Sequence, residues 1–270
     1  MDSSNVLPEA NRAALHRAHE AGLTICLCTG RCFAETEPVI RAIGLDLDAA
    51  VCVFGALVVD ARSGRTLHRT PIPRRTAAHL LEFFRERDYP ALVLHDPSEA
   101  GTDYYLVAGG GDMAAYERWL ALAPTSVRRV DRWPNDAPEP LRIGIVEDPA
   151  QAVSVQAELQ SEFAATELKC NAIFAPNYGL HVVECFAPQV NKWYAVAQLA
   201  HDAGIDASQV VAIGDDVNDV EMIRSAGLGV AMGNAVPAVR EVARAYTGTN
   251  DEAGLARFIE RLLRGEASAA

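Results

Sequence analysis

The sequence predicts an α/β protein, with a doubly wound, Rossmann-like parallel sheet and an α+β domain inserted into it. At both ends of the chain, short apolar runs alternate with helical segments, as in a parallel sheet covered by helices. The middle of the chain instead has strand-like runs in adjacent pairs. We therefore expect a core domain formed by residues 1–72 and 189–270, interrupted by an inserted domain over residues 73–188.

The first flank predicts a helix, a strand and a second helix. Pro8 suits the first position of a helix because its missing N–H would have no partner there, and Gly22 suits the residue after a helix. The run at 23–28 (LTICLC) is apolar throughout, as in a strand that is buried on both faces. A helix is then expected over residues 35–43, and strands over 49–60.

The inserted domain is expected to combine helices with paired strands, and the second flank to return to strict alternation. In the inserted domain, helices are predicted at 75–87 and 150–163 and strands at 91–96, 103–109 and 140–148. In the second flank, helices are predicted at 192–203 and 218–225, and strands at 210–214 and 227–232.

Composition narrows the class of protein. Half of the 270 residues are hydrophobic, and the formal net charge of -12 argues against a nucleic-acid or membrane-surface partner. No apolar run reaches the about 18 residues of a membrane span, and the N-terminus lacks the pattern of a secretory signal. The six cysteines fall mostly in apolar runs without metal-site spacing, so we expect buried, reduced thiols. These features predict a cytoplasmic protein.

An acidic motif follows the expected strand at 210–214. Residues 214–219 (GDDVND) place three carboxylates and an amide where open α/β sheets bind ligands. So many acidic groups are unfavourable together unless a cation lies among them, and hard oxygen ligands select Mg²⁺. An acidic first turn of a helix is the alternative interpretation. We expect Asp215 and Asp219 to point into the crevice and to bind Mg²⁺.

Three further segments lie at the same expected edge of the sheet. Thr29, Gly30 and Arg31 follow the run at 23–28, and a hydroxyl with backbone N–H groups at a helix entrance can hold a phosphate. Lys192 opens a helix and would be a counter-charge to carboxylates and phosphate, although a solvated lysine is the usual case. The glycines of 226–235 (AGLGVAMGNA) permit close backbone approach. Ordinary turns are the alternative for the first and third segments.

In this order, the four segments resemble those of the haloacid dehalogenase-like hydrolases. More narrowly they resemble the Cof-type branch, whose large α/β cap lies between the threonine and lysine motifs. The resemblance spans nearly the whole chain. It implies an Mg²⁺-dependent phosphatase of small phosphorylated metabolites, often sugar phosphates, with no nucleic-acid or membrane partner. The inserted domain would then be the cap, which closes over the site and selects the leaving group.

The resemblance also implies a role for each site residue. Thr29, with its neighbours at 30–31, would bind the transferring phosphoryl group, and Lys192 would hold both the nucleophile and the phosphate. Asn218 would touch the phosphate or the substrate. Asp215 would bind Mg²⁺, and Asp219 would orient metal-bound water and the lysine. These roles amount to phosphoryl transfer by positioning and charge neutralisation.

The sequence departs from the family at its start. Family members begin with a buried strand ending in D-x-D-G-T-L, whose first Asp is the nucleophile that becomes an aspartyl phosphate and whose second is the general acid/base. No such segment is present. Residues 1–4 (MDSS) resemble the residues that come after this motif in the family, so Asp2 is not the nucleophile. In addition, Phe54 stands where the family usually has Asn, and Trp193 where it usually has Gly.

Two explanations of this absence are open: residues upstream supply the strand, or the chain is a non-catalytic phosphate-binding remnant. Losing about five buried side chains at ~1.5–3 kcal/mol each would cost roughly 7–15 kcal/mol, as much as the ~5–15 kcal/mol stability of a domain. We therefore favour an upstream segment and expect the 270 residues alone to be inactive. A dinucleotide-binding oxidoreductase is less favoured, because residues 109–111 (GGG) lack the G-x-G-x-x-G spacing.

Four residues of the expected cap are candidates for substrate contacts, although core or surface positions are more usual for such residues. They are His95, Asp96, Arg142 and Tyr178.

Overall fold

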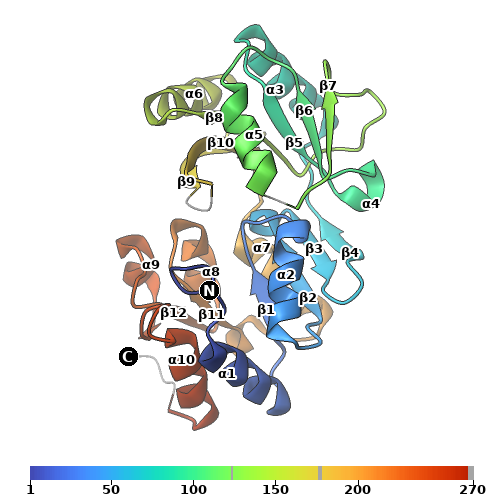
Figure 1. The fold of residues 1–270 in the computed structure, drawn as a ribbon. Coiled ribbons are helices and arrows are strands. Elements are labelled where there is room, and N and C mark those ends of the chain that lie inside the picture. The colour runs from blue at the N-terminus through green and yellow to red at the C-terminus, as the bar shows by residue number, and fades with distance from the viewer. Residues whose placement is uncertain (123, 176–177, 267–270) are drawn as a thin grey trace. The chain divides into compact units, whose positions relative to one another are not determined.

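The computed structural model describes residues 1–122, 124–175 and 178–266. The chain forms two compact units (Figure 1). The first comprises Met1–Arg31, Thr36–Gly64 and Asn191–Ala270, and the second comprises Cys32–Glu35 and Arg65–Val190. The last four residues of the expected core segment, 267–270, lie outside the described residues. Among the described residues, no helix is both long and apolar enough to span a membrane.

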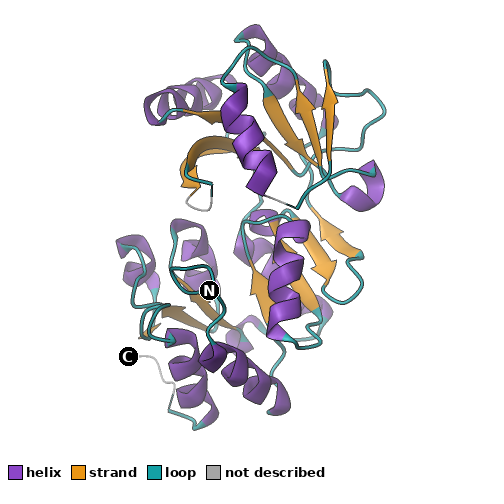
Figure 2. Ribbon diagram, in the orientation of Figure 1, coloured by secondary structure: helices purple, strands orange, loops and turns teal. Residues whose placement is uncertain are grey.

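The strands between residues 26 and 69 and those between 211 and 246 form two separate sheets (Figure 2), and the strand at 66–69 falls in the second unit. The first has the order β1-β2-β3-β4, with β1 parallel to β2 and β2 antiparallel to β3. The second has the order β11-β12-β13 and is parallel throughout. The strands of the first sheet are β1 (Cys26–Cys28), β2 (Ala49–Cys52), β3 (Leu57–Asp60) and β4 (Thr66–Arg69). Those of the second are β11 (Val211–Gly214), β12 (Leu228–Ala231) and β13 (Ala245–Tyr246).

Helices alternate with these strands along the chain, so the predicted α/β class with a parallel core is confirmed. The longer ones are α1 (Glu9–Glu20), α2 (Phe33–Ile43), α7 (Lys192–Asp202) and α10 (Gly254–Leu263). The shorter ones are η1 (Val53–Gly55), η2 (Ala207–Gln209), η3 (Val217–Asp219), α8 (Val220–Ser225) and α9 (Pro237–Val242).

One expectation for the core is wrong: the run at 23–28 is not a strand buried on both faces. Only Cys26–Cys28 forms a strand, Leu23 is 38% exposed, and Cys26 is exposed, whereas a buried thiol was expected there. The reason is that β1 ends its sheet: within the described residues it pairs with β2 alone. In the other sheet, β12 is the one partner of β11 that the described residues provide, and Val211 of β11 is 36% exposed.

The second unit contains a six-stranded sheet of order β7-β6-β5-β8-β10-β9. Its neighbouring strands are antiparallel except for β6 and β7. The strands are β5 (Ala91–Leu94), β6 (Tyr104–Val107), β7 (Val127–Val130), β8 (Arg142–Glu147), β9 (Lys169–Ala175) and β10 (Leu180–Phe186). The helices are α3 (Arg74–Glu86), α4 (Pro97–Ala100), α5 (Met113–Leu122) and α6 (Pro149–Glu162).

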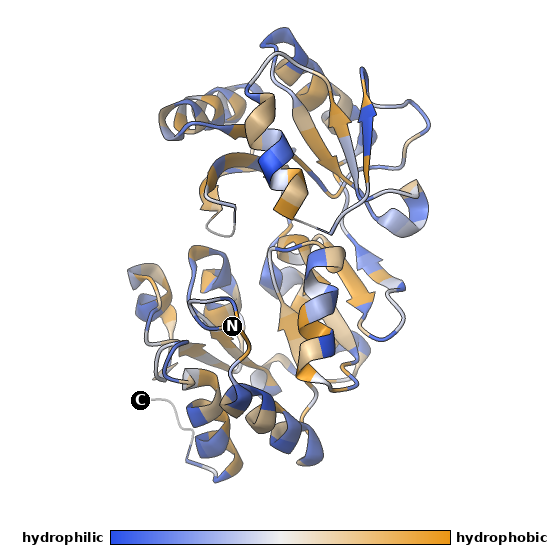
Figure 3. Cartoon of the chain, viewed as in Figure 1, coloured by the Kyte–Doolittle hydropathy of each residue, from blue (hydrophilic) through white to orange (hydrophobic). Residues whose placement is uncertain are grey.

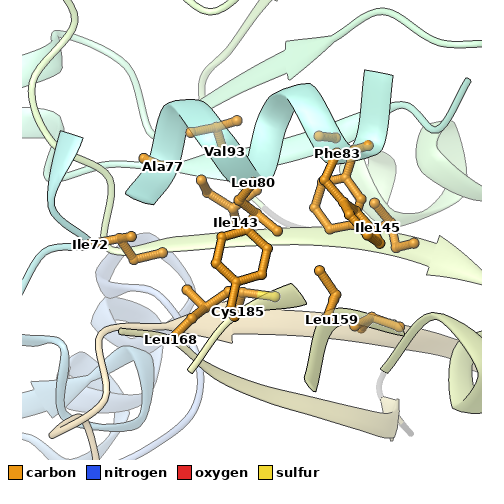
Figure 4. Packing of buried hydrophobic residues seen from close by; sticks show 14 of the residues in the cluster. Ile72, Ala77, Leu80, Phe83, Val93, Ile143, Ile145, Leu159, Leu168 and Cys185 are labelled. Atoms are coloured by element: carbon orange, nitrogen blue, oxygen red, sulfur yellow. The ribbon is translucent and has the colours of Figure 1, made fainter. Parts of the chain in front are cut away.

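The two faces of this sheet differ in what covers them. On one face, Ile143 and Ile145 of β8 pack into an apolar core with Leu80 of α3 and Leu159 of α6 (Figure 4). Because side chains alternate along a strand, residues 142, 144 and 146 lie on the opposite face. There the hydroxyl of Tyr116, on α5, donates to Pro90 O (2.7 Å) and accepts from Val146 N (3.0 Å).

Hydropathy differs between the centre and the edge of this sheet (Figure 3). The central strand β5 is apolar and fully buried, whereas β7, at the edge of the sheet, exposes both of its arginines. An edge strand with charged side chains resists pairing with other chains.

Candidate active site

The acidic motif forms a tight loop after β11. Asp219 Oδ2 accepts hydrogen bonds from the backbone N–H groups of Asp215 (3.1 Å) and Asp216 (3.2 Å). Asp216 Oδ1 in turn accepts from Val217 N (2.7 Å), which caps the short helix η3. Gly214 leaves the space for this arrangement, since a Cβ there would lie 2.5 Å from Asp219 Cγ. The spacing of the motif therefore fixes where the Asp219 carboxylate lies.

Lys192 and Asp219 form a buried ion pair. Lys192 Nζ lies 2.6 Å from Asp219 Oδ1, and the two residues are 6% and 4% exposed. Lys192 is the first residue of α7, whose N-terminus is capped by Asn191 through a hydrogen bond from Tyr194 N (2.8 Å). Removing one partner of such a pair leaves an uncompensated buried charge, so each residue depends on the other.

Asp215 lies beside this pair and has a second contact. Its Oδ2 accepts a hydrogen bond from Asn234 Nδ2 (2.6 Å), and Asn234 Oδ1 accepts from Asn250 N (3.0 Å). Burial raises the pKa of Asp215, the Asp219 carboxylate raises it further, and the Asn234 contact partly lowers it. A cation at Asp215 would relieve this unfavourable charge.

The contact of Asn234 is a feature that sequence reasoning missed. The segment 226–235 stood out for its glycines, and Asn234 received no role. Its position in the sequence could have indicated the contact, because Asn234 carries an amide and lies in the loop that follows β12, the strand next to β11. Side chains at the carboxyl ends of neighbouring parallel strands meet at one edge of the sheet.

The residues of this loop fit Mg²⁺. Asn218 Oδ1 is buried and has no hydrogen-bond partner among the described residues, so an oxygen ligand is available close to Asp215 and Asp219. The described residues contain no group of three or more His, Cys, Asp or Glu side chains suited to a metal. Mg²⁺ commonly takes only one or two carboxylates and completes its shell with water and substrate phosphate. The oxygen atoms of Asp215, Asp219 and Asn218 are therefore enough for Mg²⁺ when water and substrate phosphate supply the remaining ligands.

The segment after β1 forms the predicted turn. Thr29 Oγ1 accepts a hydrogen bond from Arg31 N (3.2 Å), and Arg31 Nη2 donates to Asn5 Oδ1 (2.8 Å). Phe54 covers this turn, because a Cβ on Gly30 would lie 2.5 Å from its ring. Phe54 itself has a positive φ of 56°. Phe54 stands where the family usually has Asn. This departure therefore packs against the turn at 29–31, which is the candidate phosphate-binding segment.

Some of the predicted site residues are linked by hydrogen bonds or an ion pair, and Thr29 is connected to them through packing of the apolar core. Lys192, Asp219 and Asp215 are linked by the contacts above. Thr29 follows Cys28, whose side chain packs against the apolar cluster that also contains Trp193 of α7 and Met222 of α8. The turn at Thr29 is therefore held to the same core. Its hydroxyl hydrogen-bonds within the turn rather than to Lys192 or the acidic loop.

Comparison with known proteins decides the family. Residues 1–259 match the haloacid dehalogenase-like hydrolases. The chain belongs to this family, and to its Cof-type branch. A putative phosphatase of Bacillus subtilis, YxeH, is 28% identical over 97% of this chain and 94% of its own length. The pyridoxal phosphate phosphatase YbhA of Escherichia coli is 29% identical over 91% of this chain and 88% of its own. The prediction of a phosphatase-type hydrolase is confirmed.

Solved structures agree with the fold. A haloacid dehalogenase-like hydrolase from Bacteroides thetaiotaomicron superimposes with a TM-score of 0.79 at 24% identity, covering 97% of this chain and 95% of that one. A protein from Thermotoga maritima gives a TM-score of 0.79 at 21% identity, covering 97% and 92%. These likenesses show the fold, and the roles of individual residues in this chain stay predictions.

Proposed function

We propose that this protein hydrolyses small phosphorylated metabolites such as sugar phosphates, with Mg²⁺ and through an aspartyl phosphate. The observation that carries the proposal is the buried Lys192–Asp219 pair beside Asp215 at the end of β11. Relatives named for their substrates support the substrate class, among them a 5-amino-6-(5-phospho-D-ribitylamino)uracil phosphatase of Bacillus subtilis that is 26% identical over 98% of this chain. We further propose the cytoplasm as its compartment, supported by cysteines that fall mostly in apolar runs of the sequence, as reduced thiols do.

Each site residue has a distinct part in this proposal. Lys192 would neutralise charge on the transferring phosphoryl group, and Asp219 would hold the lysine in place. Thr29 would donate a hydrogen bond to a phosphoryl oxygen, and Asn218 would contact phosphate or substrate. Mg²⁺, held by Asp215 and the acidic loop, would supply further charge neutralisation at the phosphoryl oxygens. In this scheme, residues 1–72 and 189–270 form the catalytic core and 73–188 the cap.

The described residues do not supply the nucleophile. The expected source is an upstream segment, and two strand edges support it. Among the described residues, β1 and β11 each end a sheet, and apolar side chains are exposed there: Leu23 and Cys26 at β1, and Val211 on β11. A further parallel strand between them, carrying D-x-D-G-T and encoded upstream, would cover these side chains. We therefore expect the 270 residues alone to be inactive.

The test compares two forms of the protein: the 270 residues, and a form extended by the upstream reading frame. We expect hydrolysis of p-nitrophenyl phosphate only by the extended form, with MgCl₂ present and abolished by EDTA. Lys192→Met in the extended form should lower the rate by about 10²-fold or more. Absence of a D-x-D-G-T segment upstream, or an extended form without turnover, would contradict the proposal.

A second candidate is a non-catalytic protein that binds a phosphate ligand. It is favoured by the absence of a D-x-D-G-T segment beside an intact Thr29, Lys192 and Asn218. This alternative predicts that phosphorylated ligands raise the melting temperature of both forms while neither releases inorganic phosphate.

A further inference from the structure

Two cysteines of the second unit face each other across neighbouring strands. Cys170 on β9 and Cys185 on β10 are direct partners in the antiparallel register, and their Sγ atoms lie 3.2 Å apart. Both lie on the face of the sheet that carries the apolar core, in which Cys185 is buried and against which Cys170 packs (Figure 4). The residues proposed to bind phosphate and Mg²⁺ belong to the first unit, so this thiol pair is no part of that site.

The backbone already meets the requirements of a disulfide. Directly opposed residues of antiparallel strands have Cα atoms about 4.5–5.5 Å apart, and disulfides span Cα distances of about 4.4–6.8 Å. A bond of about 2.05 Å would bring the two sulfurs about 1.2 Å closer than they are. Rotation of the side chains and a small shift of β9 can supply this movement, because within the described residues β9 pairs with β10 alone and ends its sheet.

The two thiols differ in their exposure. Cys185 is 0% exposed, whereas Cys170 is partly exposed. Burial also raises the pKa of the Cys185 thiol well above its ordinary value of 9.0, and the neighbouring Cys170 raises it further. Attack on an oxidant requires both access and thiolate character. An oxidant from the solvent therefore meets Cys170 first.

We propose that Cys170 and Cys185 form an oxidative modification site, at which a peroxide converts the two thiols into a cross-strand disulfide. With hydrogen peroxide, the Cys170 sulfur first attacks one oxygen: an S–O bond forms, the O–O bond breaks, and a sulfenic acid and water result. The Cys185 sulfur then attacks the sulfenic sulfur, so that the S–S bond forms and the S–O bond breaks. The leaving hydroxide takes the Cys185 proton and departs as water. In total the thiols lose two electrons, and one peroxide becomes two waters.

The disulfide ties an edge strand to its neighbour. The cross-link closes the chain segment between positions 170 and 185, which restricts the unfolded chain and stabilises the folded one. In a reducing compartment, small thiols return the pair to its reduced form by exchange, so the modification is reversible. The inference goes beyond the proposed function and does not rest on it.

Peptide mapping of the full chain tests the proposal. The reduced protein is treated with hydrogen peroxide near neutral pH, remaining thiols are blocked with iodoacetamide, and the chain is cleaved after glutamate. Because Glu184 lies between the two cysteines, they fall on separate peptides, 168–184 and 185–221. We expect these peptides to be joined, with a mass two hydrogen atoms below their sum, and we expect dithiothreitol to separate them.

Three single variants assign the chemistry. Cys185→Ala should abolish the joined peptides and leave Cys170 as a sulfenic acid, which dimedone traps. Cys170→Ala should abolish them and leave Cys185 unreacted, because that thiol is fully buried. Cys26→Ala is the matched control: it removes an exposed thiol of the first unit and should leave the joined peptides unchanged.

Melting temperatures give a second measurement. Peroxide should raise the melting temperature of the unmodified chain and of Cys26→Ala by about 5–10 °C. It should not raise that of Cys170→Ala or Cys185→Ala, in which the disulfide cannot form. Dithiothreitol should reverse the rise.

Two results of the mapping would overturn the inference. One is recovery of peptide 168–184 unjoined after peroxide treatment, with Cys170 unmodified or oxidised only to a sulfenic or sulfinic acid. The other is a bond from Cys170 to any cysteine other than Cys185 of the same chain, which non-reducing gels show as a dimer when it joins two chains. Neither result bears on the hydrolysis of phosphate esters, because the thiol pair is no part of that site.

Discussion

Lys192 Nζ and Asp219 Oδ1 lie 2.6 Å apart inside the first unit. Another ion pair, Arg224–Glu221 on α8, has the same N–O distance, but its side chains are about half exposed. Distance alone therefore does not distinguish the two pairs. Burial distinguishes them. Solvent screens the charges of the exposed pair, whereas each charge of the buried pair depends on the other for compensation.

Lys192→Met is expected to lower the free energy of unfolding by about 3–5 kcal/mol, because it leaves the Asp219 carboxylate buried without a counter-charge. Urea unfolding of the purified chain measures this. Arg224→Met is the matched control and should change stability by at most about 0.5–1 kcal/mol. The double variant Lys192→Met/Asp219→Asn should recover part of the loss. Equal losses in Lys192→Met and Arg224→Met would show that burial of the Lys192–Asp219 pair has no energetic consequence.

Asp215→Asn is expected to change how stability depends on pH. Burial and the Asp219 carboxylate raise the Asp215 pKa, so the folded chain keeps this proton at a pH where the unfolded chain has released it. The contribution of this group to stability is therefore present below its ordinary pKa of 3.8 and lost as pH rises through the folded-state pKa. Melting temperatures measured between pH 4 and pH 7 should fall less steeply for the variant.

The same variant tests metal binding. MgCl₂ should raise the melting temperature of the unmodified chain, since a ligand that binds only the folded state stabilises it. Asp215→Asn should abolish this rise, because it removes the carboxylate proposed to hold the ion. A retained Mg²⁺ response in the variant would place the metal elsewhere.

His95 is expected to make the second unit sensitive to acid. Its ring is buried, Nε2 accepts from the Trp133 indole, and Nδ1 has no hydrogen-bond partner within the described part of the chain. Burial and, to a smaller extent, the charge of nearby Arg74 together lower the His95 pKa to about 4. Its contribution to stability is therefore present above the ordinary pKa of 6.5 and lost as pH falls from there toward 4.

The loss amounts to at most about 3 kcal/mol at 1.36 kcal/mol per pKa unit. Urea unfolding followed by tryptophan fluorescence at pH 7 and pH 5 should show it. His95→Leu should flatten this dependence, and an unchanged slope in that variant would assign the acid sensitivity to other groups.

Gly214→Ala tests the packing under the acidic loop. A Cβ at this position would lie 2.5 Å from Asp219 Cγ, so the carboxylate must move away from Lys192. We expect a loss of about 1–3 kcal/mol in unfolding free energy together with a weakened Mg²⁺ response. Gly248→Ala is the control, because the nearest atoms to a Cβ there lie 3.4 Å away. Similar losses in both variants would mean that the close approach to Asp219 has no effect.

Local sequence patterns were sufficient for much of the fold and for part of the site. The alternation of apolar runs and helical spacing predicted the parallel core strands, and the spacing of GDDVND predicted where Asp215 and Asp219 stand relative to a strand end. The prediction of a fully buried strand at 23–28 was wrong, because the apolar character of a run does not indicate whether a neighbouring strand is present to cover it. Arg142 and Tyr178 were singled out as candidates without any sign that they share a cluster with Glu184 and Trp119.

The sequence by itself determined the family, the order of the motifs and the chemical groups available for phosphate and Mg²⁺, because these depend on residues close together in the chain. The tertiary structure alone decided that Lys192 pairs with Asp219 and that Asn234 contacts Asp215. It also decided that, among the described residues, β1 and β11 each end a sheet and Glu184 Oε2 and Trp119 Nε1 have no hydrogen-bond partner. These properties depend on burial and on contacts between distant segments, since the dielectric surroundings and hydrogen-bond partners of a side chain are set only when the chain has folded.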